Sequence, residues 1–173
     1  MRVICVLAIV LVILGSCSRT IYVVRHAEKV LATDTTVKMM ANDPPLSEAG
    51  KVRAFVLRDE LANKRIAHIY STNTLRTIST AEPLSQEKKI KVELYNTRDS
   101  LNQFIEQLKA MKGNVLVVGH SNTVDDIVNK LCGETKIPAD LKDHEYDDLF
   151  IIRYKGKKII FEKKKYGYPS NPE

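Results

Sequence analysis

Two histidines occur in matching surroundings at distant points of the chain. His26 follows the apolar run 21–24 and Arg25, and His120 follows the apolar run 115–118 and Gly119. Short apolar runs that stop abruptly at polar residues are typical of strands buried on both faces of a parallel sheet. Because ligands of such sheets bind outside the carboxyl ends of the strands, the two imidazoles are predicted to meet at one site.

Two arginines fit the chemistry that these histidines could perform. Arg25 directly precedes His26, and Arg76 lies in a predicted helix. Guanidinium groups bind the oxygens of a phosphoryl group in a bidentate manner, so both arginines are predicted to clamp one. A neutral imidazole can attack phosphorus in line and form a covalent phosphohistidine, which divides hydrolysis into two easier steps. His26 is the predicted nucleophile, and a protonated His120 is predicted to stabilise charge on the transferred group.

The elements that must position these side chains alternate along the chain. Strands are predicted over residues 21–24, 66–70, 91–95, 115–118, 149–154 and 157–161, the last two forming an antiparallel hairpin. Four helices are predicted between them: one capped by Ser47 with a buried stripe of Val52, Phe55 and Val56, one over about 74–86, one over 101–111, and one capped by Asn122. This alternation predicts a three-layer α/β/α sandwich.

Three motifs in a fixed order resemble those of the histidine phosphatase superfamily, which has the phosphoglycerate mutase-like fold. They are Arg25-His26-Ala27-Glu28, the segment from Ser71 through Arg76 to Thr80-Ala81, and Gly119-His120-Ser121. The segment 45–50 also matches, since the family usually shows Pro-Leu-Thr and a glycine there. The resemblance covers nearly all of a single domain over residues 20–168. It implies that His26 is the nucleophile and that Arg25, Arg76, His120 and Ser121 bind the phosphate.

Two departures from the family pattern narrow the activity that the resemblance implies. Ala27 stands where much of the family has glycine, although other members carry alanine. Lys29 stands where mutase-like members have a threonine that contacts phosphate. The second departure favours a phosphatase over a mutase.

The leaving oxygen needs a proton, so a carboxyl group is expected near the site. Glu28 is the nearest carboxylate in sequence to His26 and is the preferred general acid. In many family members the acid comes instead from the segment before the second histidine, where Glu93 and Asp99 are the alternatives. The sequence leaves this choice open.

The first sixteen residues are expected to be a signal peptide. Arg2 is followed by an apolar run over residues 3–14, which is shorter than the roughly 20 residues that a membrane-spanning helix needs. Leu14-Gly15-Ser16-Cys17 resembles a bacterial lipobox, which implies cleavage after residue 16 and lipidation of Cys17. The expected location is extracytoplasmic, anchored through lipid to a bacterial membrane at its periplasmic face or at the cell surface.

Composition limits the possible partners. The chain has 173 residues and a net charge of +6, which suits one ordinary soluble domain. Its basic runs, 155–158 and 163–165, are interpreted as a solvated hairpin edge, with anionic lipid headgroups as a secondary partner and without a nucleic-acid role. No spacing of histidines and cysteines resembles a zinc site, so neither a metal nor another cofactor is predicted.

Together these features predict a metal-independent phosphomonoester hydrolase that acts on a phosphorylated small molecule. A phosphohistidine or phosphoprotein phosphatase is the first alternative, because a short chain of this family implies a small cap and an open site. A non-catalytic lipoprotein that uses the same pocket to bind anions is the second. The sequence specifies neither the substrate nor the oligomeric state.

Overall fold

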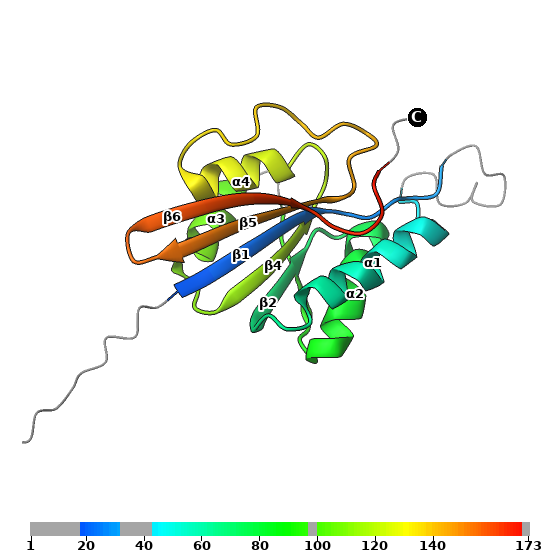
Figure 1. Ribbon diagram of the computed structural model, residues 1–173, viewed down its shortest axis with the longest axis horizontal. Coiled ribbons are helices and arrows are strands. Elements are labelled where there is room, and N and C mark those ends of the chain that lie inside the picture. The colour runs from blue at the N-terminus through cyan, green and yellow to red at the C-terminus, as the bar shows by residue number, and fades with distance from the viewer. Residues whose placement is uncertain (1–17, 32–42, 97–99, 171–173) are drawn as a thin grey trace, which may run out of the picture.

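The computed structural model describes residues 18–31, 43–96 and 100–170 (Figure 1). The predicted signal peptide, Cys17 and Asp99 lie outside these residues. Within them, no helix is both long enough and apolar enough to cross a bilayer. The elements are β1 (Ser18–Arg25), α1 (Glu48–Leu61), β2 (Ile66–Ser71), α2 (Leu75–Lys88), β3 (Val92–Leu94), α3 (Leu101–Ala110), β4 (Asn114–Gly119), α4 (Val124–Cys132), β5 (Asp148–Lys155) and β6 (Lys158–Lys165).

The strands form one mixed sheet in the order β3-β2-β4-β1-β5-β6. β1, β2, β3 and β4 run parallel, so their carboxyl ends lie at the same edge. The register sets Arg25 of β1 beside Gly119 of β4, and the His26 N–H donates to the Gly119 carbonyl at 2.9 Å. β5 and β6 continue the sheet as the predicted antiparallel hairpin. The two histidine-bearing strands are therefore direct neighbours.

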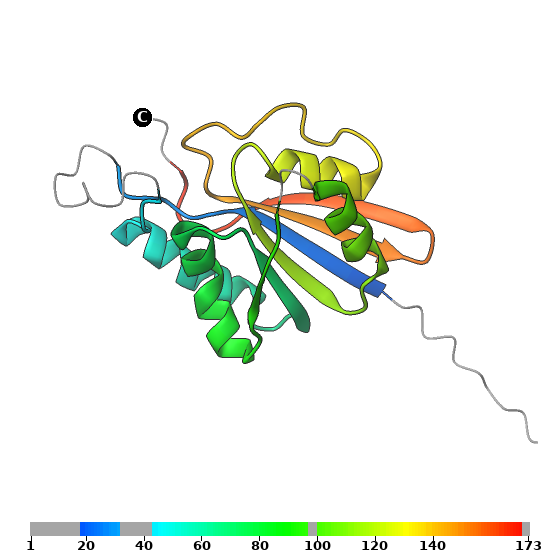
Figure 2. The same cartoon turned by 180° about the vertical axis from the view of Figure 1, so that it is seen from behind.

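Helices cover both faces of this sheet (Figures 1 and 2). α1 and α2 pack on one face, where Leu57, Leu61 and Leu84 are fully buried. α3 and α4 pack on the other, where Leu108 and Ile127 are fully buried. The apolar strands between them are buried on both sides, which explains their unbroken runs of valine and isoleucine. The predicted three-layer α/β/α sandwich is confirmed.

The predicted buried stripe of α1 is wrong at Val52 and Phe55, whereas Val56 does pack against the core. Val52 and Phe55 are 49% and 51% exposed, and the helix instead buries residues that include Arg53 and Leu57. The helix is thus rotated about its axis relative to the predicted orientation. This orientation brings Gly50 against the segment after β1, where a Cβ on Gly50 would lie 2.1 Å from the Glu28 carbonyl oxygen. A periodicity of apolar residues could not reveal a helix face built around a buried arginine.

Several predicted boundaries shift at the ends of elements. The Ser47 cap of α1 is confirmed, since its hydroxyl accepts from the Gly50 N–H at 3.1 Å. The N-cap residue of α4 is Thr123 and not Asn122, and the Thr123 hydroxyl accepts the His120 N–H at 3.0 Å instead of an N–H of the helix. β1 begins earlier than predicted, at Ser18. Ser18 and Arg19, which directly follow Cys17 in the sequence, therefore already belong to the sheet.

Candidate active site

His26 lies just beyond the end of β1 and is 4% exposed. Its Nδ1 is 2.7 Å from the Ala27 carbonyl oxygen. Because a carbonyl can only accept, this contact assigns the proton to Nδ1 and leaves a lone pair on Nε2. Burial first, and then the charges of Arg25 and His120, lower the pKa of His26 to about 3. The imidazole is thus neutral near pH 7, which is the form that a nucleophile requires.

His120 faces His26 across the ends of β1 and β4. Their ring centroids are 5.4 Å apart with an interplanar angle of 65°. Nδ1 of His120 is 3.4 Å from Nη2 of Arg76, which can only donate, so Nε2 carries the proton and donates to the Thr72 hydroxyl at 2.8 Å. Burial and the charge of Arg76 lower the pKa of His120 to about 4. The predicted protonated His120 therefore requires the negative charge of a bound substrate.

Arg76 stands in the first turn of α2 and is held by a carboxylate that the sequence did not single out. Its Nη1 is 3.1 Å from Oδ1 of Asp43, whose Oδ2 accepts the Leu75 N–H at 2.8 Å. Asp43 thus binds both an arginine and the N-terminus of a helix, which is the kind of site that an oxyanion would occupy. An acidic residue just before Pro44-Pro45 was its only signal in the sequence.

Arg25 is buried and fastened to the loop between α4 and β5. Its Nη1 donates to the carbonyls of Lys142 and Asp143 at 2.7 and 3.0 Å, and its guanidinium lies 4.1 Å from the centre of the Tyr146 ring. The Nε atoms of Arg25 and Arg76 are buried without a partner among the described residues. Since a buried unpaired donor is costly, each guanidinium keeps a donor that an oxyanion could satisfy.

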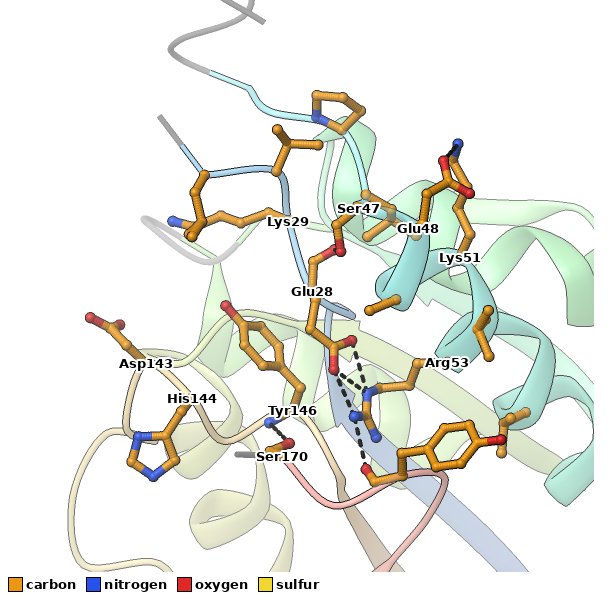
Figure 3. A pocket seen from close by; sticks show the side chains of 18 of the residues that line it. Glu28, Lys29, Ser47, Glu48, Lys51, Arg53, Asp143, His144, Tyr146 and Ser170 are labelled. Carbon is orange, nitrogen blue, oxygen red and sulfur yellow. Dashed lines mark hydrogen bonds and ion pairs between the residues drawn. The ribbon is translucent and has the colours of Figure 1, made fainter. Parts of the chain in front are cut away.

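Glu28, the predicted general acid, pairs with Arg53 of α1. Both of its carboxylate oxygens accept from Nε of Arg53 at 2.9 Å, and Oε1 also accepts from Nη2 at 2.6 Å (Figure 3). To act as the general acid, this carboxyl group would have to give up its charge-assisted hydrogen bonds to Arg53. Arg53 also donates to the carbonyls of Tyr166 and Tyr168, so the pair ties the C-terminal segment to the site.

The other predicted residues are placed as follows. Glu93 is half exposed and lies near Tyr70 and His68, at 3.3 and 3.6 Å, on β3. Ser121 contributes a backbone contact, its carbonyl accepting the Leu141 N–H at 3.0 Å. Asp99, the third candidate acid, lies outside the described residues. Asp43, by contrast, contacts the predicted site, because its carboxylate pairs with Arg76.

Thr80 joins two of the sequence motifs. Its hydroxyl accepts the Ala27 N–H at 2.9 Å and donates to the Arg76 carbonyl at 2.7 Å. Ala27 is fully buried at this junction. The segment after His26 is therefore fixed directly to the helix that carries Arg76, and the relative position of nucleophile and clamp is set by backbone contacts.

A cleft of about 1200 Å³ lies next to the segment that follows His26, with Glu28 and Lys29 in its lining. α1 forms one wall, and residues 143–146 with 168–170 form the other (Figure 3). Tyr146 lines it and lies 5.9 Å, ring to ring, from His26, whereas His26, His120, Arg25 and Arg76 are not part of its lining. Among the residues that the structure describes, no three histidine, cysteine or acidic side chains are grouped so that they could hold a metal ion.

Solved structures similar to this one share its fold. The putative phosphohistidine phosphatase SixA of Agrobacterium tumefaciens is 19% identical with a TM-score of 0.61, over 87% of this chain and 98% of that one. The protein histidine phosphatase SixA complexed with tungstate is 17% identical with a TM-score of 0.63, over 84% and 96%. Phosphoglycerate mutase of Plasmodium falciparum is 16% identical with a TM-score of 0.56, over 90% and 97%.

The sequence itself also matches a family description. A comparison with curated protein sequences gives no match. Residues 21–101, however, match the sequence model of the histidine phosphatase superfamily, branch 1. This segment contains Arg25, His26 and Arg76, and the fold then adds His120 beside them. Over residues 21–101 the chain therefore matches the histidine phosphatase superfamily, and its fold is that of the similar solved structures.

Proposed function

We propose that this protein is a metal-independent phosphomonoester hydrolase that forms a phosphohistidine on His26. The observation that carries the proposal is the state of His26. Its Nδ1 is committed to the Ala27 carbonyl, and its low pKa keeps Nε2 unprotonated. A lone pair is thus available beside His120 and Arg76, two groups suited to bind a phosphoryl group.

The proposed reaction has two displacements. In the first, Nε2 of His26 forms a bond to phosphorus while the bond to the leaving oxygen breaks, and that oxygen takes a proton from a general acid or from water. In the second, water attacks phosphorus and gives up a proton that restores this donor, the P–N bond breaks, and inorganic phosphate leaves with His26 neutral again. Arg76 stabilises the charge on the non-bridging oxygens in both steps. So does His120, which is protonated when the negatively charged substrate is bound.

Hydrolysis of para-nitrophenyl phosphate in the presence of EDTA tests this proposal. The full chain is expected to turn over the ester, and His26→Ala is expected to lose turnover, whereas His68→Ala, on β2 beside Glu93, is expected to keep it. Equal turnover by His26→Ala would contradict the mechanism. Binding of tungstate by a wild-type protein without turnover would instead favour the non-catalytic, anion-binding alternative.

A phosphohistidine or phosphoprotein phosphatase is the second candidate. The cleft of about 1200 Å³ favours it, because a bulky phosphorylated side chain with its neighbours needs an open approach to His26. The similarity of the fold to SixA proteins points in the same direction. Comparing kcat/KM for a phosphohistidine-bearing protein with that for a panel of phosphorylated metabolites decides between the two substrate classes.

We further propose that the protein is a bacterial lipoprotein anchored outside the cytoplasm. The lipobox-like sequence ending at Cys17, which follows a charged residue and an apolar run, supports this. Mass spectrometry of the mature protein should find Cys17 as a lipid-modified first residue. An unmodified Cys17 within an uncleaved chain would refute this proposal.

A further inference from the structure

The end of the sheet opposite the candidate active site carries an unusual density of basic side chains. The turns that precede β2, β3 and β4, together with the β5–β6 turn, all lie at this end, because the first three lead into parallel strands. Over residues 62–65, 88–91, 111–113 and 155–158 these turns hold nine basic residues and no acidic ones: Lys64, Arg65, Lys88, Lys89, Lys91, Lys112, Lys155, Lys157 and Lys158. We call this set the basic face.

The basic face extends along the sheet edge and is solvent-exposed. The sheet order places the turn before β3 at one side and the β5–β6 turn near the other, so the row spans roughly 24 Å at the usual strand spacing. All of its side chains are exposed except that of Lys88, which is half-buried and donates to the Ala62 carbonyl. Charge spread over such a width suits an extended surface better than a single small anion.

Little nearby negative charge offsets the basic face. On the flanking helix ends, Asp59, Glu60 and Glu106 already pair with Arg58, Lys164 and Lys109. Glu87, next to Lys88, reduces the excess by one charge. The four turns also contain no aromatic residue on which a nucleic-acid base could stack.

The start of β1 lies within this same end. Ser18 pairs with Lys155, so the chain enters the fold beside the β5–β6 turn (Figure 1). In the sequence, Ser18 directly follows Cys17 and the apolar run over residues 3–14. With one residue spanning about 3.8 Å, a membrane-inserted or lipid-bearing residue 17 would bring this end against the bilayer. The chain entry point and the charge therefore suit the same surface.

We propose that the basic face binds an anionic phospholipid surface and thereby holds the candidate active site away from the membrane. His26 and His120 follow the opposite ends of β1 and β4, so the cleft beside them opens toward the aqueous phase. Each lysine or arginine near an anionic bilayer contributes attraction that salt screens within about a Debye length. Contact is thus expected to depend on lipid charge and on ionic strength.

Lysine footprinting of the full chain in vesicles tests this proposal. The chain is reconstituted in phosphatidylcholine alone or with phosphatidylglycerol, and an impermeant amine-reactive reagent is added outside. Mass spectrometry is expected to show Lys89, Lys157 and Lys158 labelled several-fold more slowly in the anionic vesicles, with the protection lost in about 1 M salt. Lys51 and Lys142, near the carboxyl end of the sheet, serve as internal controls whose labelling stays constant.

A pair of charge-reversed variants sharpens the test. Lys157→Glu/Lys158→Glu is expected to abolish most of the protection of Lys89, whereas Lys51→Glu/Lys142→Glu, with the same change in net charge, is expected to preserve it. Equal protection in both lipid compositions, or equal protection at both ends of the sheet, would overturn the proposal. So would protection of these lysines by duplex DNA in detergent solution without protection by anionic vesicles.

Discussion

The two ends of the sheet both carry many charges, but they hold them in opposite ways. At the carboxyl end, Arg25 and Arg53 are 3% and 5% exposed, and each donates to several named acceptors. At the amino end, lysines such as Lys157 and Lys158 are exposed. Because a buried charge is costly unless it is paired, the buried arginines indicate constrained geometry at the first end. The exposed lysines indicate only a surface potential at the second.

Removing a charge from the candidate site should have the largest effect. Arg76→Ala is expected to lower kcat/KM for para-nitrophenyl phosphate by about 10²–10³-fold, because it deletes a donor to the transferred group. Steady-state kinetics provide the measurement. Lys130→Ala, an exposed charge on α4, is the control and should leave kcat/KM unchanged. A similar loss of kcat/KM in both variants would contradict the expectation that charges at the candidate site matter more for activity than exposed charges elsewhere.

Replacing a buried arginine at the carboxyl end of the sheet should also lower the free energy of unfolding more than replacing an exposed lysine at the amino end. Arg53→Met leaves Glu28 without its partner and removes the contacts to the C-terminal segment, so a loss of about 3 kcal/mol in the free energy of unfolding is expected. Lys157→Met should change it by less than about 0.5 kcal/mol. Urea unfolding followed by circular dichroism measures both. A cost for Lys157→Met that matches that for Arg53→Met would contradict this comparison.

Two glycines extend the comparison to the backbone. A Cβ at Gly50 would lie 2.1 Å from the Glu28 carbonyl oxygen, so Gly50→Ala must separate α1 from the segment after β1 and is expected to cost about 2 kcal/mol. Gly156, in the β5–β6 turn, has a φ of 57° but open space around it. Gly156→Ala should cost only about 1 kcal/mol, from backbone strain. Thermal unfolding of both variants checks that Gly50→Ala is the more destabilising of the two. A larger loss of stability in Gly156→Ala would contradict this prediction.

The pH dependence of stability should come partly from the buried histidines. The pKa of His26 is lowered from 6.5 to about 3, so below pH 6.5 the unfolded chain binds a proton that the native state does not. Stability is therefore expected to fall as pH falls through this window, by about 1 kcal/mol from His26 between pH 6.5 and 5.5. His120, with a pKa of about 4, acts in the same direction. Urea unfolding across this range should show a shallower slope for His26→Ala than for the wild type.

The sequence predicted the residues that follow the strands but not the contacts between them. Arg25, His26 and His120 stand out because polar residues end apolar runs, and that local pattern follows directly from burial in a parallel sheet. Asp43 and Arg53 have no such pattern. Their importance depends on partners in other segments, Arg76 and Glu28, and a single sequence does not reveal which distant charges will pair.

The same limit applies to the predicted general acid, Glu28, whose partner the sequence did not reveal. Proximity in sequence favoured Glu28, but its side chain points to α1 and pairs with Arg53 (Figure 3). The orientation of α1 depends in turn on that pair and on the close approach at Gly50. A helix whose buried face includes a charged residue departs from apolar periodicity, so neither the face nor the partner of Glu28 was predictable from local patterns.

The covalent state of His26 during turnover tests the central claim most directly. The full chain is mixed with a phosphomonoester, quenched in alkali within the first turnovers and digested for mass spectrometry. We predict one added phosphoryl group on His26, stable in alkali and lost in acid, and none in His26→Ala. Turnover at the wild-type rate with no phosphorylated His26, or with the phosphoryl group on His120, would contradict the account.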